Sequence, residues 1–119
     1  MEDDEIRKKI DEIKKYIENN LKADLKVCTL AQKFDIPVKT LQDNFKYYCG
    51  CTLKGYINRK RLERLKLIIK TMINPGLYSE HYYAREIGLK SSVCLNNFLK
   101  KMTGMTFLEF CNKVRNDET

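Results

Sequence analysis

The chain has few of the side chains that build metal and catalytic sites. It contains one histidine, His81, and its five cysteines do not fall at the spacing of a zinc finger. No nucleophile and base, no carboxylate pair and no phosphate-binding glycine loop stand at a usable spacing. We therefore expect no metal, no cofactor and no enzymatic activity, and we assign His81 a structural or surface role.

The sequence also lacks a long apolar run, and we expect no targeting segment. Residues 1–5 are acidic, unlike the basic head of a signal peptide, and the most apolar stretch, residues 65–73, is interrupted by Lys66 and Lys70. We expect a cytoplasmic protein that does not enter the membrane. An odd number of cysteines fits this compartment, and the thiols are interpreted as reduced and used as small hydrophobic side chains.

Charge is divided unevenly along the chain. Residues 1–18 carry five basic and seven acidic side chains, whereas the rest of the chain carries 18 basic and nine acidic ones. With 119 residues, of which 43% are hydrophobic, the chain can form one small domain or two very small ones with thin cores. The basic surplus suits a polyanionic partner, although many small proteins are basic for solubility alone.

A degenerate internal repeat organises the basic part. The segment that begins at Ala31 recurs from Ala84 at an offset of 53 residues, and residues 41–56 recur at an offset of 54. The second copy therefore carries one extra residue in its turn. Two similar units in one chain can recognise two similar targets.

Apolar spacing predicts helices throughout and no strand. Near the start, isoleucines recur every three or four residues, at Ile6, Ile10, Ile13 and Ile17. They form one stripe on a helix that ends near residues 19–20, and its two heptads favour packing on the domain over a coiled coil. Further helices are expected at residues 26–34, 38–48, 52–72 and 79–87.

Each copy has the turn chemistry of a helix-turn-helix unit. Asp35 and Gly88 hold equivalent positions, and both residue types tolerate the left-handed conformation that follows a helix end. Pro37 stops the first helix and is accepted at the start of the next one. A short helix, a tight turn and a longer helix in succession form the helix-turn-helix pattern.

The second helix of each unit has an apolar and a polar face. The inward faces are expected to hold Val38, Leu41, Phe45 and Tyr48 in one copy and Leu95, Leu99 and Met102 in the other. The outward faces hold Lys39, Gln42, Asp43 and Lys46, and Val93, Asn96, Asn97 and Lys100. Amides match the adenine edge and lysine matches guanine, which favours base reading in a major groove over a solvated face. Asp43 could accept from cytosine or orient Lys39.

A long basic helix, expected at residues 52–72, joins the two units. Its apolar stripe holds Leu53, Tyr56, Ile57, Leu62, Leu65, Ile68, Ile69 and Met72. At about 1.5 Å per residue it spans about 30 Å, close to the roughly 34 Å between successive major grooves on one side of B-DNA. This length favours a bipartite DNA site.

Over about residues 6–112, the chain resembles the DNA-binding domain of AraC/XylS-type transcription regulators. The resemblance rests on residues 16–21, 30–46, 50–57, 61–62, 84–88 and 104–110. It implies an all-α, homeodomain-like fold of about seven helices in two helix-turn-helix units. Their bounds would be residues 1–50, a linking helix over 51–73, and residues 74–119.

The resemblance also implies a function. The chain would be a bacterial, sequence-specific transcription regulator that binds successive major grooves of a promoter. An activator that recruits RNA polymerase is favoured over a repressor. Base contacts would come from Lys39, Gln42, Asp43, Ser92, Val93, Asn96 and Asn97. Phosphate contacts are expected from Thr40, Lys46, Lys54, Lys90, Lys100 and Lys101. A dimer could form through a sensing domain outside this sequence.

The second copy departs from the family pattern. Residues 79–87 carry aromatic and polar side chains where relatives alternate isoleucine and alanine; Ser79 is expected to cap this helix, and Tyr82 and Tyr83 to pack under it. Leu65 and Leu99 also replace residues that are usual in the family. The alternative function is therefore a protein-interaction module that keeps the fold but has lost base reading in one or both units.

Overall fold

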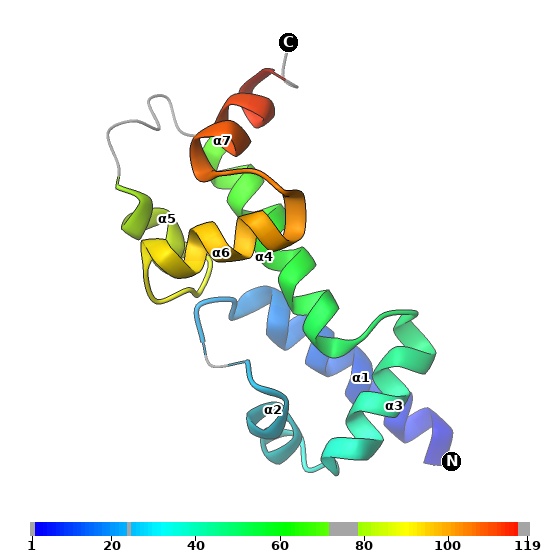
Figure 1. Ribbon diagram of the computed structural model, residues 1–119. Helices are drawn as coiled ribbons and strands as arrows, with labels where there is room; N and C mark the ends of the chain where they lie inside the picture. The colour runs from blue at the N-terminus through cyan, green and yellow to red at the C-terminus, as the bar shows by residue number, and fades with distance from the viewer. Residues whose placement is uncertain (1, 24, 72–78, 117–119) are drawn as a thin grey trace. The chain divides into compact units, whose positions relative to one another are not determined.

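The computed structural model describes residues 2–23, 25–71 and 79–116, and every regular element in these ranges is a helix (Figure 1). The elements are α1 (Glu2–Asn19), α2 (Val27–Lys33), α3 (Val38–Cys49), α4 (Leu53–Thr71), α5 (Glu80–Glu86), α6 (Ser92–Thr103) and α7 (Phe107–Asn116). The all-α prediction is confirmed, and the predicted end of the linking helix at Met72 lies outside the described residues. None of the described helices is both long enough and apolar enough to span a bilayer.

The chain divides into two compact units, Met1–Lys60 and Arg61–Thr119. In the first unit, α3 packs against α1 and α2. The isoleucine stripe of α1 lies in this core, as predicted, because Ile10, Ile13 and Ile17 are buried and Ile6 packs against them. The stripe is therefore used for packing within the unit.

Tyr56 joins α4 to the core of the first unit and to a charged cluster. The cationic groups of Lys14, Arg59 and Lys60 lie 5.5–5.7 Å from the centroid of its ring. Glu18 pairs with Lys60 at 3.2 Å and accepts a hydrogen bond from the Tyr56 hydroxyl. Burial and the charge of Glu18 raise the pKa of Tyr56 to about 12.

In the second unit, α6 packs against α5 and α7. Its core consists of Leu65, Ile68, Ile69, Tyr83, Ala84, Ile87, Leu95, Leu99, Phe110, Cys111 and Val114. The first three belong to α4, which also supplies Leu53, Tyr56 and Ile57 to the core of the first unit. The predicted packing of the α5 tyrosines is confirmed, since Tyr83 is buried and Tyr82 lies against the core.

The turn inside each helix-turn-helix unit has the predicted left-handed residue. Asp35 has a φ of 51° and Gly88 a φ of 89°. In both copies the next residue donates its N–H to the alanine carbonyl five residues back, over 2.9 Å in the first turn and 2.8 Å in the second. Residues 34–37 separate α2 from α3 and residues 87–91 separate α5 from α6, so the extra residue lies in the second turn, as predicted.

The second helices of the two units, α3 and α6, both end at a glycine and with the same geometry. Gly50 follows α3 with a φ of 74°, and Gly104 follows α6 with a φ of 77°. Each glycine donates its N–H over 2.9 Å to the lysine carbonyl four residues earlier. Apart from each glycine and its two chain neighbours, no atom lies within 4 Å of the position that a Cβ would take at either residue, so the left-handed backbone alone favours glycine.

Two predictions about burial are wrong. Val38 is predicted to face inward but is 40% exposed, because it is the first residue of α3 and stands at the edge of the core. Cys28 and Cys94 are exposed, so they are not used as small hydrophobic side chains, although all five thiols are free. Cys111 does behave as predicted, and burial raises the pKa of its thiol to about 11.

We predict that Gly104→Ala lowers the free energy of unfolding by about 1 kcal/mol, because alanine must then adopt the left-handed conformation. Gly104→Asn should cost less, since asparagine tolerates this conformation. Urea unfolding followed by far-UV circular dichroism measures both changes. Equal stability of the wild type and both variants would contradict this account of the turn.

Candidate nucleic-acid interface

The outward face of α3 is polar, exposed and free of internal bonds. It consists of Lys39, Gln42, Asp43 and Lys46, all of which are exposed. The fully buried Leu41 and Phe45 fix the opposite side of the helix. Within the described ranges no ion pair joins Asp43 to Lys39, and no hydrogen bond engages the amide of Gln42. The Gln42 amide can therefore offer a donor and an acceptor to a ligand.

Two apolar side chains flank this face. Val38 lies beside Gln42, and Tyr47, which is 79% exposed, lies beside Asp43 at a helical spacing of four residues. No role for Tyr47 is predicted from the sequence, although its spacing of four residues from Asp43 indicates a position beside the outward face of α3. Val38 is predicted on the other side of the helix. The surface of α3 therefore combines polar groups in the middle with apolar contact area at both edges.

The first turns of α3 and α6 are capped differently. At α6 the Ser91 hydroxyl oxygen accepts the N–H of Cys94 at 3.2 Å. Pro37 precedes α3, and no side chain caps that helix. Thr40 occupies the position that corresponds to Cys94, so the first N–H groups of α3 are left for water or an anion.

The corresponding face of α6 is more apolar. It consists of Val93, Asn96, Asn97 and Lys100, with Ser92 at its edge. Val93 is 67% exposed, Asn97 and Lys100 are exposed, and Ser92 and Asn96 are half-buried. The predicted residues thus lie together on one side of the helix, but they are not equally accessible.

The amide of Asn96 is bonded inside the second unit. Its Nδ2 donates to Glu80 Oε1 on α5 at 2.6 Å and to the Ser92 carbonyl at 3.0 Å. Its Oδ1 accepts the N–H of Phe107, the first residue of α7, at 3.3 Å. Both donor hydrogens are in use, whereas pairing with adenine needs one donor and one acceptor. Asn96 therefore connects three helices, while its counterpart Gln42 is unconstrained.

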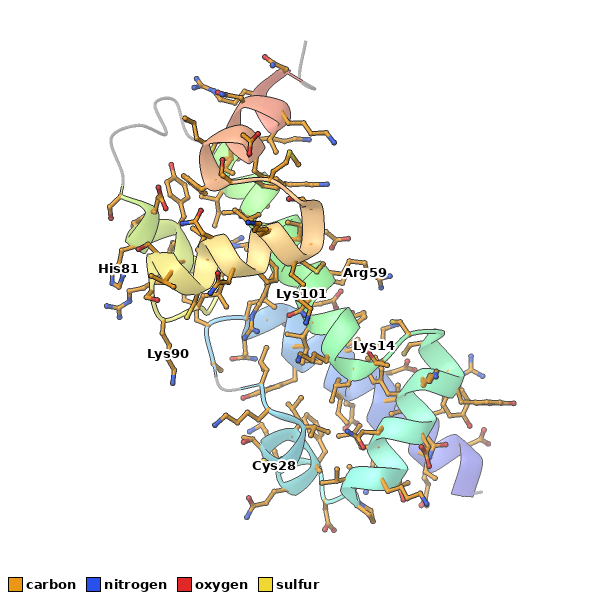
Figure 2. The ribbon with its side chains drawn as sticks, in the orientation of Figure 1. Lys14, Cys28, Arg59, His81, Lys90 and Lys101 are labelled. Atoms are coloured by element: carbon orange, nitrogen blue, oxygen red, sulfur yellow. The ribbon has the colours of Figure 1, made fainter. Side chains whose placement is uncertain are left out.

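The predicted phosphate-contact residues come from α3, α4 and α6 and from the turn between α5 and α6. Lys46, Lys54, Lys90, Lys100 and Lys101 are exposed, and Thr40 is half-buried. Lys90 projects away from the turn between α5 and α6 (Figure 2). In the part of the chain that the structure describes, no carboxylate pairs with any of these lysines, and no three His, Cys, Asp or Glu side chains gather at a metal site. The two faces therefore present mainly lysines and amides, together with the carboxylate of Asp43 on α3 and the apolar side chain of Val93 on α6.

We predict that Asn96→Ala lowers the free energy of unfolding by about 1–3 kcal/mol, because it removes bonds to α5 and α7 and leaves polar groups unpaired. Asn97→Ala is the control, since its exposed side chain should change stability by less than about 0.5 kcal/mol. Urea unfolding of both variants gives the comparison. An Asn96→Ala variant as stable as the wild type would mean that these bonds do not hold the unit together.

No protein-family model and no curated protein sequence matches the chain. Solved structures do match it. The C-terminal domain of AraT, a response regulator from Geobacillus stearothermophilus, aligns with a TM-score of 0.76 and 17% identity, over 92% of this chain and 84% of that one. The C-terminal domain of the two-component response regulator YesN from Fusobacterium nucleatum gives 0.74 and 22%, over 88% and 95%.

A third structure was solved with DNA. The DNA-binding domain of AdpA, a global transcriptional factor, in complex with a target DNA, aligns with a TM-score of 0.77 and 18% identity, over 91% of this chain and 94% of that one. At these identities the likeness establishes the fold. The chain therefore shares the fold of these three domains, as its resemblance to AraC/XylS-type regulators predicts.

Proposed function

We propose that the chain is a sequence-specific DNA-binding regulator of transcription that inserts α3 and α6 into successive major-groove segments of a promoter. One observation carries the proposal: the second helix of each helix-turn-helix unit presents an exposed face with an amide and a lysine, Gln42 and Lys46 on α3 and Asn97 and Lys100 on α6. A helix fits the major groove, and these side chains match base edges. The AdpA domain, which shares this fold, was solved in complex with a target DNA.

In this proposal the two helices have different contacts. On α3, Lys39, Gln42 and Asp43 contact bases, and the free amide of Gln42 pairs with adenine. On α6, Ser92, Val93 and Asn97 are the proposed base contacts, and the exposed methyl groups of Val93 fit the methyl group of thymine. Asn96 could contact a base only after it releases one of its internal bonds.

The remaining proposed contacts hold the DNA backbone. They come from Thr40, Lys46, Lys54, Lys90, Lys100 and Lys101. Lysines that neutralise phosphates release counterions, which makes binding dependent on salt. We further propose that the regulator acts in the cytoplasm as an activator through RNA polymerase, and that it could dimerise through a sensing domain outside this sequence.

Selection of bound duplexes from a random pool tests the proposal. The expected site has two blocks whose centres are about 10–10.5 base pairs apart, one for each recognition helix. With five lysines at phosphates, the slope of log K against log salt should be about −4.5. If random duplex binds as tightly as any selected one, sequence-specific recognition is excluded. An absence of duplex binding would favour a protein-interaction module.

We predict that Gln42→Ala weakens binding to the selected site by about 1–3 kcal/mol and relaxes preference at one base position. Lys46→Ala should instead weaken all sequences alike and flatten the salt slope by about one. Lys8→Ala removes the same charge from α1 and serves as the matched control for Lys46→Ala. Fluorescence anisotropy at several salt concentrations separates these effects. A Gln42→Ala variant with unchanged base preference would remove Gln42 from the set of base contacts.

A further inference from the structure

A hollow of about 250 Å³ lies in the second unit where α6, α7 and the end of α4 meet; we call it the α6–α7 groove. Its apolar lining comes from Met102, Met105, Phe110 and Val114. Phe110 and Val114 are buried parts of the core, whereas the two methionines are half-buried and Met105 packs against the core. Methionine is flexible and polarisable, and it is common on surfaces that adapt to a partner.

Two lysine side chains line this groove, and neither pairs with a carboxylate among the described residues. Lys66 of α4 and Lys113 of α7 both line it, and both are exposed. Within the described ranges neither forms an ion pair, and the lining contains no aspartate or glutamate. An occupant that combines an apolar side chain with negative charge would complement both parts of the surface.

The remaining polar group in the lining is already bonded. The Thr103 hydroxyl donates to the Leu99 carbonyl at 2.8 Å, and its oxygen accepts the N–H of Met105 at 3.2 Å. It therefore fixes the loop that carries Met105 and adds little to ligand recognition. Recognition of a ligand in the groove therefore depends on the apolar lining and the two lysines.

The size of the groove favours a side chain over a free small molecule. Pockets for drug-sized ligands measure roughly 300–1,000 Å³ and enclose most of the ligand. The α6–α7 groove is smaller, at about 250 Å³. Such a volume suits one large apolar side chain that anchors a longer segment lying across the surface.

The groove also lies away from the proposed DNA-contacting face of α6. At about 100° per residue, Met102 is roughly 180° around the helix from Val93. A segment bound at Met102 would therefore leave Val93, Asn97 and Lys100 exposed. Occupation of the groove is compatible with DNA contact by the same helix.

We propose that the α6–α7 groove binds a short acidic segment of a partner protein, which inserts one large apolar side chain between Met102 and Met105. The negative charges on either side of this anchor pair with Lys66 and Lys113. The surface gives the domain a protein contact that is separate from its DNA contacts.

Display of random peptides of about a dozen residues, selected on the full chain without DNA, tests this proposal independently of the proposed function. The peptides recovered should share a leucine, phenylalanine or tryptophan flanked by aspartate or glutamate. Two-dimensional NMR of the chain with a synthetic copy of the consensus peptide should show shifts at Lys66, Met105 and Lys113. A consensus without acidic residues, shifts elsewhere or no recovered peptide would overturn the proposal.

A charge-reversed variant makes the test quantitative. Lys66→Glu with Lys113→Glu should weaken peptide binding at least about tenfold by fluorescence anisotropy, and replacing the peptide anchor by alanine should have an effect of about the same size. Lys8→Glu with Lys15→Glu changes the net charge equally on the exposed surface of α1 and is the matched control. Equal weakening in both double variants would mean that the peptide senses net charge only, which would overturn a site at the groove.

Discussion

Helices α2, α3, α5 and α6 are too short to persist alone, so this structure depends on the burial of their apolar faces. α2 and α5 have seven residues each and α3 and α6 have 12, whereas isolated helices below about 12–15 residues are marginal in water. Leu41 and Phe45 anchor α3, Leu95 and Leu99 anchor α6, and α4 contributes to both cores. Because the inward faces are fixed in this way, the outward faces are fixed as well.

The two copies share the same backbone turns but differ in the side chains on their outward faces. Their turns and terminal glycines use the same backbone hydrogen bonds at almost the same lengths. On the outward faces, however, Gln42 is free and Asn96 is tied to α5 and α7. The bonds of Asn96 join α6 to α7 and to α5, the helix that departs most from the pattern of the family that the sequence resembles. In that unit a side chain at a predicted contact position bonds to two neighbouring helices instead.

The features that could be predicted from sequence are those set by neighbours along the chain. Helical spacing indicates which faces of α1, α3 and α6 are buried, and residue type indicates the left-handed positions Asp35 and Gly88. The accessibility of individual side chains on the candidate interface could not be predicted in this way. Val38 is exposed because the core ends there, and Asn96 bonds to Glu80, 16 residues away, and to a backbone N–H of α7. Contacts of this kind depend on tertiary packing, which periodicity does not describe.

The exposure of Val93 bears on which chemical forms of DNA the second unit could recognise. A valine in the major groove detects a methyl group at the C5 position of a pyrimidine, and it forms no hydrogen bond that identifies the base. Thymine carries this group, and so does cytosine after methylation at C5. With Asn96 bonded internally, the proposed contact of Val93 with DNA would have a larger share in the selectivity of α6. Recognition by the second unit would then respond to epigenetic modification of cytosine as well as to base sequence.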